Sequence, residues 1–195
     1  MVRVLSFVAA AVLAVGSFVN AAEVEIGSKA PTFAGIPGAD GKSYGLDSFK
    51  EAKVVVVVFT CNSCPVALDY EDRIIEFTKQ YKDKGVAVIA VNQKSSEDIE
   101  AVKKRAEEKG FNFPYCYDKS QDAARAFGAR VTPHFFVLDK DRTIQYMGAF
   151  DDSAKEPKTH YVNDAVDALL AGKKPEKSET DAIGCGIGIK KVTKK

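Results

Sequence analysis

Residues 54–65 read VVVVVFTCNSCP, and both halves of this stretch carry structural information. The valines and the phenylalanine form a continuous apolar run, which is typical of a strand covered on both faces in a mostly parallel sheet. Cys61 and Cys64 follow this strand three positions apart, and Pro65 comes directly after them. Because proline is harmless in the first turn of a helix and costly in its interior, we expect a helix that begins at about Cys61 or Asn62 and presents Cys61 at its exposed tip.

Further along, apolar residues recur at three- and four-residue steps where helices are expected, and run continuously where buried strands are expected. The expected elements are a helix that ends near Gly85, a strand over 86–91, a helix capped by Ser95 or Ser96 that runs to Gly110, a short helix over 121–127, two antiparallel strands within 134–148 and a helix over 161–170. The lead-in before residue 54 is expected to be extended or to form an irregular hairpin. This order predicts one α/β domain, a three-layer α/β/α sandwich around a central mixed sheet.

The chain begins like an exported protein. Arg3 and an apolar stretch from Val4 to Val19 precede small residues, which is the layout of a secretory signal peptide. We expect cleavage after Ala21, so that residues 1–21 are removed. The apolar stretch is shorter than the ~20 residues that cross a bilayer, and no membrane segment is expected in the mature form. The mature protein is expected in the periplasm or outside the cell.

Residues 22–172 are then predicted to form the domain, and residues 173–195 a flexible tail rich in glycine and lysine. The 28 basic and 27 acidic residues of the chain are interspersed, so we expect neither nucleic acid nor an anionic membrane as a partner. All four cysteines lie in the exported part, where disulfides persist. Four are too few for a fold built on disulfides, so their positions need a chemical explanation.

Cys61 and Cys64 are expected where the N–H groups of a first helical turn have no backbone partner, an arrangement that stabilises a thiolate. A structural disulfide between them would close only a four-residue loop and would gain little entropy. A metal site needs more ligands than two thiolates, and Cys116, Cys185 and His134 are the residues that would have to supply them. A redox dithiol accounts for both the spacing and the position. We favour the dithiol, with no metal and no cofactor.

Two stretches of the sequence resemble the thioredoxin superfamily: VVVVVFTCNSCP, and VTPHFFVLDKD at residues 131–141. More narrowly, the chain resembles the exported redoxin-type members, which are related to thiol-disulfide oxidoreductases and to the alkyl hydroperoxide reductase group. The likeness covers about residues 24–172. It implies a thioredoxin-like fold in which Cys61 attacks a disulfide and Cys64 resolves it. It also implies a cis Pro133 opposite the pair, where the neighbouring backbone binds the extended chain of a substrate.

The resemblance also places Thr60 and Thr132 beside the pair, as residues that support it or bind substrate. Thr60 stands where thioredoxin itself carries Trp, and a valine stands where thioredoxin has a buried acid on the preceding strand. The proton acceptor for Cys64 is therefore not assigned. Asp69 and Glu71 are near in sequence, but we expect them to be solvated charges on the helix surface.

The other two cysteines differ in their surroundings. Cys116 lies among aromatic residues and is expected to be a packed, inert thiol. Cys185 lies among glycines in the tail, where it is an unpaired thiol, a third redox thiol that reaches the pair, or a bridge to another chain. Arg130 and His134 flank the Thr-Pro segment. Arg130 is expected on the surface, and His134 at the start of a strand without a catalytic role.

We therefore expect an exported thiol-disulfide oxidoreductase that acts on protein or small-molecule disulfides together with a redox partner protein. A peroxide-reducing antioxidant is the first alternative. Peroxiredoxins carry Thr three residues before the reactive cysteine and Pro four residues before that Thr, and neither Cys61 nor Cys64 has this pattern. A copper-handling module is the second alternative, since the Cys-Pro pair resembles copper-delivery relatives of the fold, although those have a wider cysteine spacing.

Overall fold

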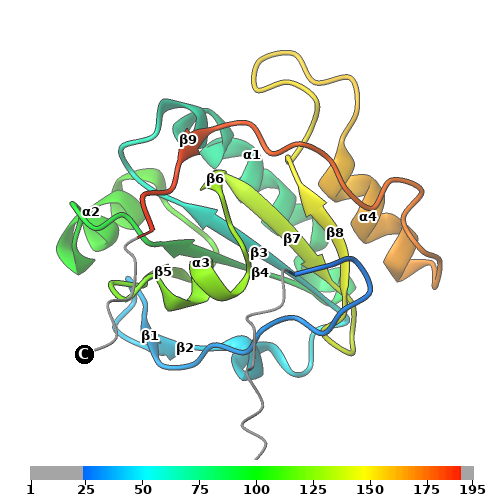
Figure 1. Ribbon diagram of the computed structural model, residues 1–195, viewed down its shortest axis with the longest axis horizontal. Helices are drawn as coiled ribbons and strands as arrows, with labels where there is room; N and C mark the ends of the chain where they lie inside the picture. The colour runs from blue at the N-terminus through cyan, green and yellow to red at the C-terminus, as the bar shows by residue number, and fades with distance from the viewer. Residues whose placement is uncertain (1–23, 190–195) are drawn as a thin grey trace, which may run out of the picture.

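The valine run forms the centre of a five-stranded mixed sheet in the computed structural model, which describes residues 24–189 (Figure 1). In their order across the sheet, the strands are β5 (Tyr115–Tyr117), β4 (Val86–Asn92), β3 (Val54–Thr60), β7 (His134–Leu138) and β8 (Ile144–Gly148). β3 runs parallel to β4, and β4 to β5, whereas β7 is antiparallel to both of its neighbours. The predicted mixed sheet with a buried central strand is confirmed.

Helices cover both faces of this sheet. They are the α-helices α1 (Pro65–Tyr81), α2 (Ile99–Lys109), α3 (Asp122–Ala126) and α4 (Tyr161–Leu170), with two short 3-10 helices, η1 (Leu46–Phe49) and η2 (Lys82–Lys84). Alternate side chains of β3 point to opposite faces. Val56 and Val58 pack in one core with α1 and α4, and Val57 and Phe59 pack in the other with α3 and the lead-in. Because both faces are covered, every side chain of Val54–Phe59 is at most 1% exposed.

α1 begins later than the sequence predicts. It starts at Pro65, with Cys64 as its N-cap residue, rather than at Cys61 or Asn62. The residues between the two cysteines form a turn whose backbone N–H groups bond to a side chain outside the helix. The predicted start is therefore wrong, because these donors are engaged elsewhere and the first helical turn forms only after them.

α2 also begins later than expected, at Ile99. The side chain of Asp98 accepts a hydrogen bond of 2.8 Å from the backbone N–H of Ala101, which satisfies one of the unpaired donors of the first turn. Asp98 is therefore the N-cap residue, in place of the predicted Ser95 or Ser96.

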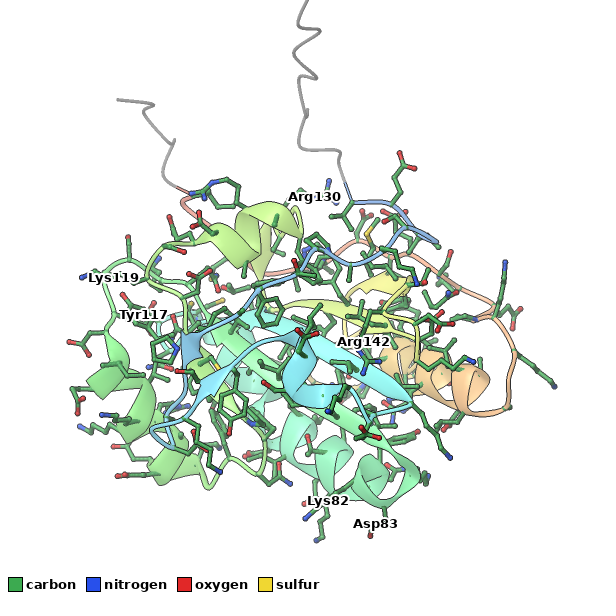
Figure 2. All side chains as sticks on the ribbon, turned by 90° about the horizontal axis from the view of Figure 1, so that it is seen from below. Lys82, Asp83, Tyr117, Lys119, Arg130 and Arg142 are labelled. Atoms are coloured by element: carbon green, nitrogen blue, oxygen red, sulfur yellow. The ribbon has the colours of Figure 1, made fainter. Side chains whose placement is uncertain are left out.

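The lead-in packs on the face of the sheet that carries Val57. Within it, β1 (Ile36–Pro37) and β2 (Ser43–Tyr44) pair antiparallel, which agrees with the expected irregular hairpin. Arg142 lies in the turn between β7 and β8 and donates hydrogen bonds to backbone carbonyl groups of residues 49 and 52 (Figure 2). This arginine thereby fastens η1 to the end of the sheet.

Residues 173–189, where the sequence predicts a flexible tail, lie against the domain at two places (Figure 1). Near β8, two backbone hydrogen bonds of 3.0 and 3.1 Å join Met147 to residues 178–180. Further on, β9 (Cys185–Gly186) pairs antiparallel with β6 (Val131–Thr132). The difference arises because backbone pairing with distant strands positions this segment, and a glycine-rich composition does not reveal such pairing.

The predicted signal peptide, residues 1–21, lies outside the described residues. Between residues 24 and 189, no helix combines the length and the apolar character that crossing a membrane requires.

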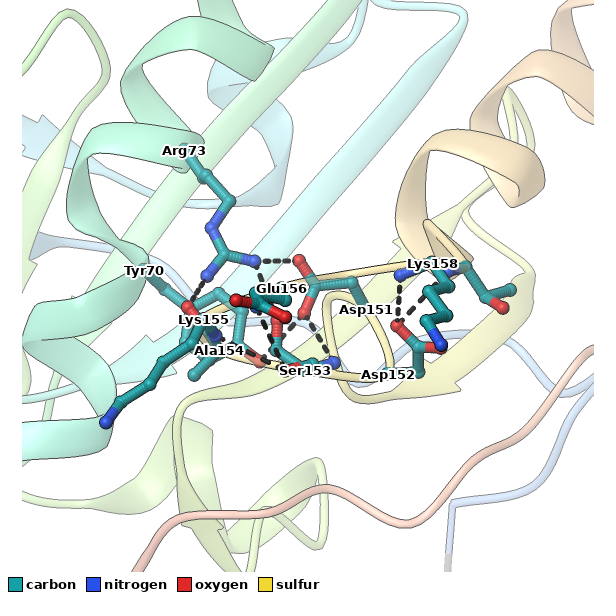
Figure 3. A network of polar contacts seen from close by, with 10 residues as sticks. Tyr70, Arg73, Asp151, Asp152, Ser153, Ala154, Lys155, Glu156 and Lys158 are labelled. Carbon is teal, nitrogen blue, oxygen red and sulfur yellow. Dashed lines mark hydrogen bonds and ion pairs between the residues drawn. The ribbon is translucent and has the colours of Figure 1, made fainter.

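A buried carboxylate ties the loop before α4 to α1, the helix that follows the cysteine pair. Asp151 is 2% exposed, accepts a hydrogen bond of 2.9 Å from the hydroxyl of Tyr70, and forms an ion pair with Arg73 (Figure 3). Arg73 also donates to the backbone carbonyl groups of Ser153 and Ala154. Because the charged partners satisfy one another, the loop can lie on the helix without leaving a lone buried charge.

Replacing Arg73 by Met is expected to lower the free energy of unfolding by about 3 kcal/mol, because the buried carboxylate of Asp151 loses its charged partner. Lys42→Met is the matched control, since the ion pair of Lys42 with Asp40 is solvent-exposed. Its loss is expected to change stability by less than about 1 kcal/mol. Urea denaturation of both variants measures these values, and equal effects would contradict the role assigned to Asp151.

Candidate active site

Cys61 and Cys64 lie at the carboxyl end of the central strand, in the turn that leads into α1. Cys61 directly follows β3, and the carbonyl of Cys64 accepts a hydrogen bond of 3.1 Å from the N–H of Leu68 in the first turn of α1. The two cysteines are 4% and 1% exposed. The prediction that Cys61 sits at an exposed helix tip is therefore wrong, because it precedes the helix and Cys185 packs on the pair from the C-terminal segment.

The sulfur of Cys64 has several polar partners. It lies 3.0 Å from the carbonyl oxygen of Thr132 and 2.7 Å from Sγ of Cys185. Burial raises the pKa of Cys64, but hydrogen bonds with the side chains of Cys185 and Thr132 and with the backbone N–H of Ala67 outweigh it, so the pKa is lowered. The hydrogen bond with Cys64 raises the pKa of Cys185, and burial adds to this shift. Of the two thiols in contact, Cys64 therefore loses its proton more readily than Cys185.

The sequence places both cysteines at the N–H groups of the first helical turn, and in the structure these groups interact with Cys64. Because α1 begins at Pro65, its first unpaired N–H groups face the residue just before it. The N–H of Ala67 accordingly interacts with Cys64. The N-terminus of α1 therefore lowers the pKa of Cys64, the second cysteine of the pair.

Thr132, the residue before Pro133, contacts the sulfurs of both cysteines. Thr132 is 2% exposed, and its hydroxyl oxygen is 3.5 Å from Sγ of Cys61, a residue 71 positions earlier. The Thr132–Pro133 peptide bond is cis, as the resemblance implies. Thr60, directly before Cys61, is the last residue of β3 and lies in register with Asn92 of β4.

A cavity of about 170 Å³ opens beside the two sulfurs. Its lining includes Cys61, Cys64, Gln93, Gln121, Thr132 and residues 185–188. The side-chain amide of Gln121 donates hydrogen bonds to the backbone carbonyl groups of Gln93 and Gly188, at 3.0 and 3.2 Å. The wall of the cavity is therefore built partly from the C-terminal segment.

Glu97 holds the turn between the two cysteines, a role that is not predicted from the sequence. Its carboxylate accepts hydrogen bonds of 3.1 Å from the backbone N–H groups of Asn62 and Ser63, and one of 2.7 Å from the side-chain amide of Asn92. Hydrogen bonds to a charged acceptor are stronger than neutral ones. In the sequence, Glu97 lies in a polar stretch and resembles a solvated charge. The one available signal is that β3 and β4 are parallel, so the loops that follow them meet at the same edge.

The side chain of Asn62 completes this network. Its carbonyl oxygen accepts a hydrogen bond of 2.6 Å from the hydroxyl of Tyr115, and its amide donates to the carbonyl of Ala101 at 3.1 Å. Asn92 in turn donates to the hydroxyl of Tyr115 at 2.9 Å. The backbone between the two sulfurs is therefore held from β4, β5 and α2 together.

His134 belongs to the core and not to the cysteine site. It is 4% exposed, its ring centroid lies 4.5 Å from that of Phe136, and its Nδ1 accepts a hydrogen bond of 3.4 Å from the backbone N–H of Arg130. Burial lowers the pKa of His134 to about 4, and the charge of Arg130 adds to the shift. Arg130 itself is exposed, as expected.

Cys116 is fully buried, and burial raises its pKa to about 12, with the charge of Asp40 adding to the shift. This agrees with a packed, inert thiol. The expectation of a solvated charge is wrong for Glu71, which is 7% exposed and pairs with Arg105 at 2.8 Å, because α2 packs over it. Asp69 is exposed. Within residues 24–189, no group of three or more His, Cys, Asp or Glu side chains is placed to hold a metal ion.

A three-layer sandwich with a buried cysteine pair beside a cis X-Pro bond defines an oxidoreductase of the thioredoxin superfamily. The chain belongs to the redoxin family, whose family model matches residues 25–166. The predicted thioredoxin-like fold and the resemblance to redoxin-type proteins are both confirmed.

Three proteins are similar to this chain in sequence or structure. Thiol-disulfide oxidoreductase ResA of Bacillus thuringiensis is 30% identical over 131 residues, which cover 66% of this chain and 72% of that protein. A putative peroxiredoxin of Mycobacterium tuberculosis is 27% identical over 134 residues, which cover 60% of this chain and 80% of that protein. The crystal structure of a conserved protein from Geobacillus kaustophilus has a TM-score of 0.80 and 32% identity, over 88% of this chain and 96% of that one.

Glu97→Gln is expected to lower the free energy of unfolding of the reduced protein by about 1–3 kcal/mol, because an amide has only one acceptor oxygen for the two backbone donors. Glu100→Gln is the matched control, since Glu100 forms an exposed ion pair with Lys103 and its loss is expected to change stability by less than about 1 kcal/mol. Chemical denaturation under reducing conditions measures both. A loss for Glu97→Gln no larger than for Glu100→Gln would show that the turn does not depend on the carboxylate.

His134 is expected to make the stability of the fold depend on pH. The unfolded chain takes up a proton at the ordinary pKa of 6.5, whereas the folded protein does so only at about 4. This contribution to stability is complete above about pH 6.5 and falls by up to about 3 kcal/mol as the pH drops to about 4. Urea denaturation across this range is the measurement. His134→Gln cannot titrate and should lose less stability; the same pH dependence in both proteins would contradict the assignment.

Proposed function

We propose that the protein is a thiol-disulfide oxidoreductase whose redox pair is Cys61 and Cys64. The observation that carries the proposal is the position of Thr132, whose hydroxyl oxygen lies 3.5 Å from Sγ of Cys61 and whose carbonyl oxygen lies 3.0 Å from Sγ of Cys64. The pair therefore faces the backbone that leads into the cis Pro133, where an extended substrate chain can pair. Thr60 supports the site as the residue between the central strand and Cys61. The likeness to a thiol-disulfide oxidoreductase supports the same activity.

In the proposed reaction, the thiolate of Cys61 attacks one sulfur of a substrate disulfide, and the other substrate sulfur leaves as a thiolate. Cys64 then attacks Sγ of Cys61, the mixed disulfide breaks, and the second substrate sulfur leaves. The products are a reduced substrate and a Cys61–Cys64 disulfide. The lowered pKa of Cys64 suits the second step, because the thiolate is the attacking form.

The same hydrogen bonds influence the reduction potential of the pair. Contacts that favour the thiolate of Cys64 stabilise the reduced dithiol relative to the disulfide. A more stable reduced form makes the pair a stronger oxidant.

Protein or small-molecule disulfides are the proposed substrates, and a redox partner protein restores the pair after each cycle. The signal peptide predicted at residues 1–21 supports export to the periplasm or out of the cell. Disulfides persist in those compartments, which suits a dithiol that acts on them.

Cys61→Ser is expected to abolish the reaction with a disulfide probe, oxidised glutathione, because no attacking sulfur remains. Cys64→Ser is expected to accumulate a mixed disulfide between Cys61 and glutathione, which intact-mass measurement detects. Cys116→Ala is the matched control and should keep the wild-type rate, since this buried thiol lies outside the site. Wild-type turnover in both Cys61→Ser and Cys64→Ser would refute the proposal.

A peroxide-reducing activity is the second candidate, favoured by the likeness to a putative peroxiredoxin. In that chemistry a cysteine is oxidised to sulfenic acid, and a neighbouring thiol condenses with it to a disulfide and water. The residue three positions before Cys61 is Val58, where peroxiredoxins carry Thr. Consumption of hydrogen peroxide by the reduced protein, faster than by free glutathione and absent in Cys61→Ser, distinguishes this activity from disulfide exchange.

A further inference from the structure

The C-terminal residues 184–187 lie along the strand that leads into the cis-proline (Figure 1). β9 pairs antiparallel with β6, so that Cys185 lies opposite Thr132. The backbone N–H of Ile187 donates to the carbonyl of Arg130 at 2.9 Å. The chain thus adds a short strand of its own at the place where the proposed function puts an extended substrate.

Gly184 brings this segment unusually close to its partner strand. A Cβ atom at Gly184 would lie 2.0 Å from the carbonyl oxygen of Thr132 and 2.6 Å from its carbonyl carbon, so no other residue fits without displacing the segment. Gly186, two residues later, has open space at the corresponding position. The close approach is therefore specific to the residue that precedes Cys185.

Three sulfurs meet as a result. Sγ of Cys185 lies 2.7 Å from Sγ of Cys64, and Cys185 packs in one cluster with Cys61 and Cys64. Cys61 and Cys64 are 4% and 1% exposed, whereas Cys185 is partly exposed. Of the three cysteines in this cluster, Cys185 is therefore the one that is partly exposed to solvent.

We propose that residues 184–187 are a built-in substrate segment and that Cys185 is a third redox thiol, which exchanges with the disulfide of the pair at Cys64. This inference rests on the proposed function, because the pair must first be oxidised by a substrate disulfide. To that function it adds a segment of the chain itself, residues 184–187, that pairs where a substrate would pair, and a Cys64–Cys185 disulfide.

The exchange is balanced within the chain. The thiolate of Cys185, formed by loss of its proton to solvent, attacks Sγ of Cys64 in the Cys61–Cys64 disulfide. The Cys64–Cys185 bond forms while the Cys61–Cys64 bond breaks, and the electron pair of the broken bond remains on Cys61 as a thiolate. One disulfide is present before and after the step, so no outside oxidant or reductant is consumed.

The exchange moves the disulfide from two buried sulfurs to one that is partly exposed. A dithiol protein can then attack Sγ of Cys185, releasing Cys64 as a thiolate and freeing the segment from the pair. The second thiol of that protein breaks the resulting mixed disulfide and leaves Cys185 reduced. Cys185 thereby passes the two electrons of a reducing dithiol to the buried pair.

Disulfide mapping of the oxidised full chain tests the exchange. Wild type is oxidised with oxidised glutathione, its free thiols are alkylated, and the monomeric fraction is digested with trypsin. Cys61 and Cys64 share peptide 54–73, because no Lys or Arg lies between them, and Cys185 falls in peptide 178–190. We expect these peptides to be linked through Cys64, with the alkyl group on Cys61. A wild-type product with only a Cys61–Cys64 disulfide, or with Cys61 linked to Cys185, would overturn the inference.

Cys185→Ser separates this inference from the proposed function. The variant is expected to form the Cys61–Cys64 disulfide under the same oxidation, because both sulfurs of the pair remain. If Cys185→Ser behaves in this way but the wild type lacks the Cys64–Cys185 link, the inference fails and the proposed function stands. If Cys185→Ser forms no Cys61–Cys64 disulfide, the proposed function fails and the inference falls with it.

A second pair of variants tests the position of the segment. Gly184→Val retains Cys185 but cannot fit against Thr132, and Gly186→Ala is the matched control. In the reduced protein, alkylation of Cys61 and Cys64 by a bulky maleimide is expected to rise about tenfold in Gly184→Val, which corresponds to about 1.4 kcal/mol of lost pairing, and to stay at the wild-type rate in Gly186→Ala. Thermal unfolding checks that the domain remains folded in both variants. An unchanged alkylation rate in Gly184→Val, with the Cys64–Cys185 link intact, would refute the inference.

Discussion

Burial of the central strand on both faces is the constraint on which the rest of the structure depends. Val54–Phe59 pack between two layers, and exposing either face would forfeit about 25 cal/mol for each Å² of apolar surface. The turn after this strand consequently lies at the edge of the sheet where β3 and β4 both end. The cysteine pair occupies that edge, next to the loop after β4 and to the strand that precedes the cis-proline.

The polar contacts of the turn then distinguish two cysteines that are only three positions apart. Glu97 binds the backbone donors between them, which leaves the helix to begin at Pro65. The unpaired N–H groups of the first turn therefore act on Cys64. One sulfur lies at the end of the strand, and the other lies at the start of the helix, where its pKa is lowered.

The C-terminal segment adds an element that concerns both stability and chemistry. An exposed strand edge tends to pair with any extended chain that reaches it, and the edge of β6 lies directly before the cis Pro133. In this protein β9 occupies that edge and brings Cys185 into contact with Cys64. The same glycine-rich composition that suggests free movement also permits the close backbone approach at Gly184.

The sequence by itself determined the central strand, the β7–β8 pair, the bounds of α4 and the place of Cys61 and Cys64 directly after the central strand, because periodicity, turn residues and cysteine spacing are local properties. Only the tertiary structure decided where α1 begins, what Glu97 binds and which sulfur Cys185 meets. Each of these depends on a hydrogen bond or contact between segments far apart in the chain, and a local pattern records which groups are available but not which distant partner satisfies them.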